Sequence, residues 1–159
     1  MEKEQLLKNL REEFKEIKKR LGFKSSFKDL NDIFSIEEMV LQEGYVFPSL
    51  NRKLSRRIVD IYKSWLNYAC SLMNPSPDNI LILMESKMLG QEDKKKISNI
   101  IKKISSLISS NNLIALTKDE KLETKFIDDA VQFWNNYFKI EMIKILEKIK
   151  EGWDEDKSE

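Results

Sequence analysis

The feature that most constrains the fold is the spacing of the apolar side chains, which recur every three or four residues along almost the whole chain. This spacing places them on one face of an α-helix. Turn-forming residues are scarce, because the 159 residues include only 4 glycines and 3 prolines. That is too few to punctuate an all-β sandwich or a nucleotide-binding α/β sheet. We therefore expect an all-α fold, an irregular or orthogonal bundle of about six to seven helices.

Glycine, proline and asparagine divide the apolar pattern into segments. Gly22 and Gly44 are placed to end helices, and Asn74–Pro77 interrupts the pattern. Residues 45–48 are expected to be extended, because the residue before a proline is disfavoured in a helix. The pair Asn111–Asn112 indicates a turn. The expected helices cover residues 6–21, 27–34, 36–42, 50–73, 78–89, 92–109 and 117–151.

Side chains that satisfy the free N–H groups of a helix start refine three of these boundaries. Ser35 with Glu38, and Thr117 with Glu120, have the spacing of a capping box. Ser76 is placed to cap a helix whose first position is a proline. We predict a helix start after each of these three residues.

We expect residues 1–159 to form a single helical domain, since the chain has no internal repeat and no low-complexity linker. The amphipathic segment 1–24 is a candidate for a semi-detached arm, and the acidic tail 154–159 for a frayed end. The N-terminus has no signal-peptide pattern, and the longest apolar run, Ile80–Met84, is far too short to cross a membrane. We therefore expect a cytoplasmic protein without membrane association.

Composition excludes several kinds of chemistry. The chain contains no histidine, which removes catalytic triads, histidine-ligated metals and histidine acid–base catalysis. No base is available to activate the one cysteine, Cys70, so we expect it to be a small buried packing residue. No glycine-rich phosphate loop is present. We expect no catalytic residue, no metal and no cofactor.

Charge is strongly segregated although the net charge is only +1. The charged residues between 25 and 47 are mostly acidic. Those between 48 and 74 are mostly basic and include three of the five arginines. On a helix, five cations share the face opposite the apolar stripe, and four of them lie in the first two turns, where the dipole disfavours positive charge. This pattern indicates either a solvated face paired with residues 29–43 or a surface for a negatively charged partner. The five cations are Arg52, Lys53, Arg56, Arg57 and Lys63.

A phosphate backbone is the partner that we favour for this basic face. Lys95 and Lys102, in a second basic cluster on the helix at 92–109, are weaker candidates for the same role. The expected function is a non-catalytic helical subunit or adaptor of a nucleic-acid-handling assembly. Such a protein binds DNA or RNA with little sequence preference and strong salt dependence, beside other protein subunits.

Two other functions remain open. The first is a protein–protein interaction module that docks an acidic partner or self-associates through its N-terminal helix. The second is a small carboxylate-metal helical enzyme, for which Glu120-x-x-Glu123 and Glu38 with Gln42 are the nearest ligand patterns. The aromatic residues between 126 and 138 have helical spacing, so we expect them in the core rather than stacked on bases.

Two fragments resemble the C-terminal region of the primase large subunit. They are Phe47-Pro48 followed by Arg52-Lys53-Leu54, and the segment 129–134 with Phe138. The cysteines that hold the iron–sulfur cluster of that family are absent, so no residue role is transferred. What the resemblance implies about function agrees with the charge pattern.

Overall fold

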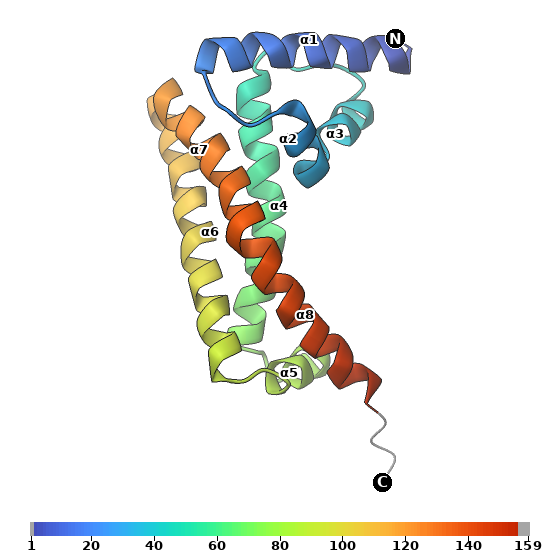
Figure 1. Cartoon of the computed structure of the whole chain (residues 1–159), viewed down its shortest axis with the longest axis vertical. Coiled ribbons are helices and arrows are strands. Elements are labelled where there is room, and N and C mark those ends of the chain that lie inside the picture. The colour runs from blue at the N-terminus through green and yellow to red at the C-terminus, as the bar shows by residue number, and fades with distance from the viewer. Residues whose placement is uncertain (1, 156–159) are drawn as a thin grey trace. The chain divides into compact units, whose positions relative to one another are not determined.

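A computed structural model describes residues 2–155 of the chain, and these residues are almost entirely helical (Figure 1). Helices α7, η1 and α8 follow one another without a break, so the described residues form seven helical rods and no strand. The expectation of an all-α fold is confirmed. The elements are α1 (Lys3–Leu21), α2 (Phe27–Phe34), α3 (Ile36–Glu43), α4 (Leu50–Met73), α5 (Ile80–Lys87), α6 (Gln91–Thr117), α7 (Glu120–Phe133), the π-helix η1 (Trp134–Phe138) and α8 (Lys139–Asp154).

Several boundaries agree with the sequence pattern. Gly22 and Gly44 end α1 and α3 in the left-handed region, with φ of 86° and 82°. Only glycine adopts this conformation without a steric cost. Helix α4 has the bounds that its apolar spacing predicts. Of the predicted acidic tail, residues 156–159 lie outside the described part of the chain.

The turn expected at Asn111–Asn112 is wrong, because α6 continues through both residues to Thr117. The Asn111 side chain is 8% exposed and accepts a hydrogen bond from the Arg52 guanidinium at 3.0 Å. Asparagine disfavours helices chiefly by bonding to nearby backbone, and here its side chain is engaged in a tertiary contact instead. Helix α6 ends before Lys118, whose φ is 59°.

The three expected caps are also wrong. Ser35 precedes α3 in a left-handed conformation and makes no capping bond, and Asn31 accepts from the Glu37 N–H instead. Asp119, rather than Thr117, accepts from the first N–H groups of α7. Helix α5 is capped by Asn79 and not by Ser76. In each case an asparagine or aspartate side chain within four residues of the expected cap accepts the hydrogen bond instead. The oxygens of these side chains cap a helix at least as well as a hydroxyl does.

Two compact units make up the chain. The first unit contains residues 2–61 and 107–132, and the second contains residues 62–106 and 133–155. The expectation that residues 1–159 form one domain stays a prediction beside this division. Each unit is described by itself.

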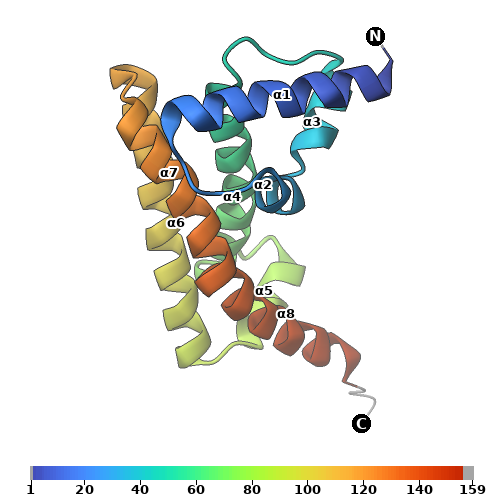
Figure 2. The same cartoon turned by 45° about the horizontal axis from the view of Figure 1, so that its top comes forward.

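In the first unit, α1 lies across the ends at which α4 begins, α6 ends and α7 begins (Figures 1 and 2). The apolar stripe of α1 is buried, and α1 packs against α3. Segment 1–24 therefore has its apolar face covered. The buried apolar residues of this unit are Leu6, Leu10, Phe14, Ile17, Phe23, Leu30, Phe34, Ile36, Met39, Val40, Leu50, Leu54, Ile58, Val59, Leu107, Ile114, Phe126, Ile127, Ala130 and Val131.

Asp128 on α7 holds the loop between α1 and α2. Its carboxylate accepts from the backbone N–H groups of Lys24 and Ser25 and from the Ser25 hydroxyl, at 2.7–3.0 Å. Next to it, the Thr124 hydroxyl donates to the Leu21 carbonyl at 2.8 Å. Side chains on one face of α7 thus form hydrogen bonds with backbone groups of residues 21–25 that have no partner within a helix.

Asp128→Ala is expected to lower the free energy of unfolding by about 2–3 kcal/mol, because hydrogen bonds to a charged acceptor are lost. The neighbouring Asp129→Ala removes only an exposed pair with Lys125 and should cost less than about 1 kcal/mol. Urea unfolding of the two variants measures the difference. Equal losses would show that Asp128 does not hold the loop.

In the second unit, a cluster of aromatic rings packs around Tyr62. Tyr62 is 1% exposed, and burial raises the pKa of its hydroxyl. The ring of Phe138 lies 6.0 Å from that of Tyr62, and the ring of Phe133 lies at 5.9 Å. The wider turn of η1 brings these two phenylalanines, five residues apart, into contact with the same tyrosine. The expectation that the aromatic stretch packs in the core is confirmed for Phe126, Phe133 and Phe138, whereas Trp134 and Tyr137 are half-buried.

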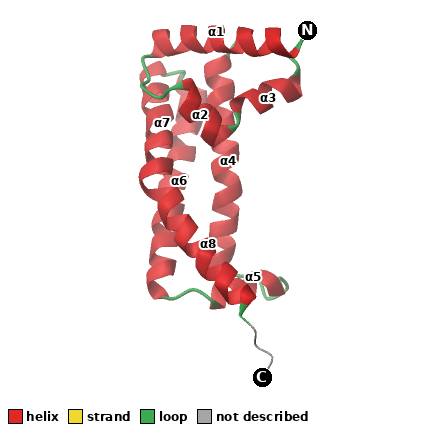
Figure 3. Ribbon diagram, turned by 45° about the vertical axis from the view of Figure 1, so that its right-hand side comes forward, coloured by secondary structure: helices red, strands yellow, loops and turns green. Residues whose placement is uncertain are grey.

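Two ion pairs join helices of the second unit, which Figure 3 shows from another side. The Lys148 ammonium lies 2.8 Å from the Asp93 carboxylate, and Lys96 lies 2.9 Å from Glu141. The hydrogen bond from Lys96 lowers the pKa of the Glu141 carboxyl, although desolvation opposes that shift. Both pairs connect α6 to α8.

The lowered pKa of Glu141 predicts a pH-dependent contribution to stability. The contribution is complete above the ordinary carboxyl pKa of 4.5 and is lost as the pH falls through the lower pKa of the folded state. Glu141→Gln should therefore reduce the melting temperature at pH 7 and have almost no effect near pH 3. Glu147→Gln, an exposed change on the same helix, serves as the control. A loss for Glu141→Gln that is independent of pH would contradict the assignment.

Candidate anion site at the start of helix α4

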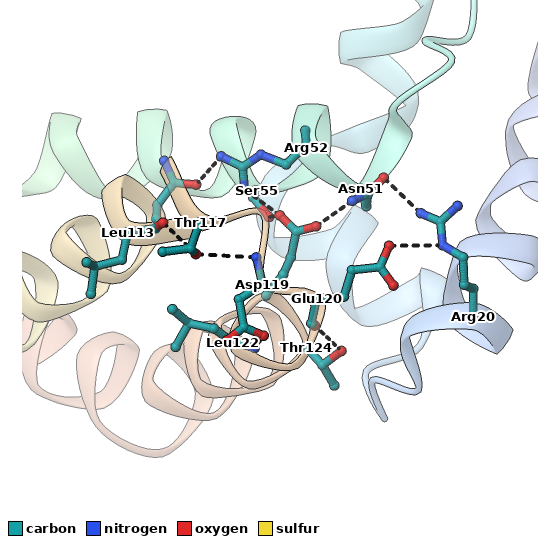
Figure 4. A network of polar contacts seen from close by, with 12 residues as sticks. Arg20, Asn51, Arg52, Ser55, Leu113, Thr117, Asp119, Glu120, Leu122 and Thr124 are labelled. Atoms are coloured by element: carbon teal, nitrogen blue, oxygen red, sulfur yellow. Dashed lines mark hydrogen bonds and ion pairs between the residues drawn. The ribbon is translucent and has the colours of Figure 1, made fainter. Parts of the chain in front are cut away.

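A buried carboxylate lies at the start of α4. Glu123 on α7 is 1% exposed and accepts hydrogen bonds from three side chains of α4 (Figure 4). They are the amide of Asn51 at 2.5 Å, the hydroxyl of Ser55 at 3.0 Å and the guanidinium of Arg52. All three donors meet one carboxylate, so its negative charge is satisfied without water.

This carboxylate explains why α4 tolerates cations in its first turn. The positive end of the helix dipole repels Arg52 and Lys53. No acidic residue lies in the first turn of α4 to compensate these two charges locally. Glu123 compensates Arg52, and Glu43, the last residue of α3, lies 3.2 Å from the Lys53 ammonium. The arginine is 14% exposed and is part of the packed structure.

Arg20 extends the network to α1. Its guanidinium donates to the side-chain amide oxygen of Asn51 at 3.3 Å and lies 3.5 Å from Glu120 (Figure 4). Glu120 and Glu123, the two carboxylates weighed above as metal ligands, are therefore each paired with an arginine. Within residues 2–155 no group of three or more acidic or cysteine side chains is arranged to hold a metal ion.

Glu123→Ala should lower the free energy of unfolding by about 3–5 kcal/mol, because it leaves a largely buried guanidinium without its counter-charge. Glu120→Ala removes the pair with Arg20, which is more than half exposed on both sides, and should cost less than about 1 kcal/mol. Chemical denaturation of both variants measures the contrast. A loss of less than about 1 kcal/mol for Glu123→Ala would contradict the role assigned to this carboxylate.

The five cations predicted on one face have different surroundings. Arg57 donates to the Phe34 carbonyl at 2.7 Å, and Lys53 also lies 4.3 Å from the centre of the Phe47 ring. With Arg52, this places three of the five in internal contacts. Arg56 is exposed, and its side chain makes no hydrogen bond or ion pair with the described residues. The acidic segment 29–43 thus covers part of the basic face and leaves Arg56 uncovered.

The remaining predicted residues lie in the second unit. Lys63, Lys95 and Lys102 are exposed and make no side-chain hydrogen bond or ion pair within residues 2–155. The structure therefore brings together Arg52, Lys53 and Arg56 in the first unit, whereas the other three lysines belong to the second unit.

A hollow of about 340 Å³ lies beside these cations in the first unit. It adds one cation that the sequence pattern does not reveal, Lys118, which follows α6. The Lys118 side chain has no partner among the described residues. Nothing in the local sequence links this lysine to α4, because it lies 62 positions after Arg56, the nearest other cation of the hollow in the sequence. The hollow is lined by Phe47, Pro48, Ser49, Arg52, Lys53, Arg56 and Lys118.

The charge of the hollow is positive. Glu123 and Glu43 offset Arg52 and Lys53, whereas no carboxylate of the described residues offsets Arg56 or Lys118. The positive end of the α4 dipole adds to these two charges, and the Ser49 hydroxyl supplies a donor. Cations and hydrogen-bond donors at a helix N-terminus have the chemistry that an oxyanion such as phosphate requires.

A separate apolar surface lies in the second unit. On α5, Ile80 and Leu81 are 66% and 65% exposed, and Trp153 of α8 lines the same hollow as Leu81 and donates its N–H to Glu85. The expectation that Cys70 is buried is wrong. The core side of α4 at this point is formed by Ala69 and Leu72, and Cys70 is exposed.

Comparisons with protein-family models, curated proteins and solved structures give no match to this chain. None of the helices in the described residues is long and apolar enough to cross a membrane.

Proposed function

We propose that the protein is a non-catalytic helical subunit or adaptor of a cytoplasmic assembly that handles nucleic acid, and that it binds the phosphate backbone. The observation that carries this proposal is the pair of uncompensated cations, Arg56 and Lys118, on one hollow at the positive end of α4. Contacts of this kind recognise charge and not base identity, so binding has little sequence preference.

The other basic residues contribute in different ways. Arg52 and Arg57 hold the start of α4 against its neighbours, and Arg52 also lines the hollow. Lys63, Lys95 and Lys102, which are exposed and have no side-chain partner within residues 2–155, are further candidates for phosphate contacts in the second unit. Changing Arg52, Arg56 and Arg57 together would confuse binding with folding, so Arg56 is the residue of that group to test.

A protein–protein interaction module is the second candidate. The observation that favours it is the exposure of Ile80 and Leu81 beside Trp153, since exposed apolar patches commonly mark contacts with other proteins. This surface and the basic hollow are compatible in a subunit that binds both nucleic acid and another protein.

Arg56→Glu with Lys118→Glu should weaken binding of a labelled oligonucleotide by at least tenfold at about 50 mM salt, where phosphate contacts are strong. The slope of log K against log salt concentration should also fall by about 1–2, because roughly two phosphate contacts are lost. Fluorescence anisotropy over a salt series measures both quantities.

Lys8→Glu with Lys15→Glu is the matched control. It makes the same change in net charge on an exposed part of α1, beside Glu4 and Glu12. The control should keep most of the affinity. If the unchanged protein binds no single- or double-stranded oligonucleotide at this salt concentration, the proposal is wrong. The same conclusion follows if both double variants lose affinity equally.

A further inference from the structure

The loop between α3 and α4 places two aromatic rings beside the basic hollow. Phe47 lines the hollow, and the ring of Tyr45 packs against Phe47 with 4.6 Å between the ring centres. Tyr45 is 49% exposed. Part of this ring is therefore available to a further planar group.

Phe47 is held in position from the α4 side. The Lys53 ammonium lies 4.3 Å from the centre of its ring, and the same ammonium is paired with Glu43. Cation–π and ion-pair contacts together restrain the ring that supports Tyr45. The aromatic pair is thus a supported platform next to two unpaired cations.

From this juxtaposition we infer that the hollow takes one nucleotide unit of a single strand, an inference that rests on the proposed function. The phosphate lies between Arg56 and Lys118, and the unpaired base stacks on Tyr45. A duplex cannot make the second contact, because its bases are stacked on one another inside the helix. Aromatic stacking next to a positively charged groove is the usual means of binding single strands without sequence preference.

The backbone of Lys118 gives this assignment a test. Its φ of 59° is in the left-handed region, which disfavours every residue with a Cβ atom. Glycine would remove that strain, so the protein with lysine at this position is less stable than it would be with glycine. The lysine side chain is therefore present at a cost in stability. Lys118→Gly should raise the melting temperature and at the same time weaken binding of a single-stranded oligonucleotide about fivefold or more. If Lys118→Gly keeps full affinity, the placement of the phosphate is wrong.

Tyr45 is tested by comparing ligands. The unchanged protein should bind a single-stranded oligonucleotide more tightly than a duplex of the same length. Tyr45→Ala should lose about tenfold in affinity for the strand, as is typical when one stacked base loses its aromatic partner. The same variant should lose nothing with the duplex or with an abasic strand, which has no base to stack.

Tyr45→Phe keeps the ring and should restore binding, whereas Tyr45→Leu keeps apolar bulk and should not. Melting temperatures of all three variants show that the fold is retained. Equal binding of strand and duplex, unaffected by Tyr45→Ala, would overturn this inference and leave the proposed function standing. Absence of binding to any nucleic acid would overturn both.

A free mononucleotide provides the last comparison, because it offers the same phosphate and base. Adenosine monophosphate should bind more weakly than the oligonucleotide, since it offers a single phosphate group whereas the strand offers several. If the mononucleotide binds as tightly as the strand, the site belongs to a free nucleotide, and the assignment to a strand is overturned.

Discussion

The buried carboxylate of Glu123 is the contact on which the first unit depends. Three α4 side chains donate to it, and one of them is a largely buried arginine. A carboxylate removed from water is stable only when it is paired and hydrogen-bonded, and both conditions hold here. Because α4, α6 and α7 meet at this network through Arg52 and Asn111, the network fixes where the first turn of α4 lies. Arg20 extends it to α1.

The same network separates the structural cations from those available to a partner. Arg52 and Lys53 are neutralised by Glu123 and Glu43, whereas Arg56 has no such partner among the described residues. Lys118, which is distant from α4 in the sequence, lines the same hollow and has a backbone conformation that favours glycine. The hollow is therefore a place where the chain keeps positive charge uncompensated and accepts local strain. That combination indicates binding more strongly than the number of basic residues does.

Local sequence rules predict the parts of this structure that depend on local physics. Apolar spacing predicts α4 from Leu50 to Met73, and Gly22 and Gly44 end the helices that they were expected to end. The rules fail where a distant residue decides the outcome. Asn111 remains helical because its side chain accepts a hydrogen bond from Arg52. The basic start of α4 is stabilised by Glu123, which lies 71 residues after Arg52 in the sequence. Arg56 was found from its charge pattern, but Lys118 could not be, since only the fold brings it to α4.

The most direct measurement of the central claim is a titration of the unchanged protein with a single-stranded oligonucleotide, followed by the NMR shifts of its backbone amides. The account predicts that the largest shifts in the first unit occur at residues 45–56 and at Lys118. Amides of α1 near Lys8 and Lys15, which carry exposed cations of the same kind, should move little. Shifts spread evenly over all exposed lysines, or absent from the hollow, would contradict it.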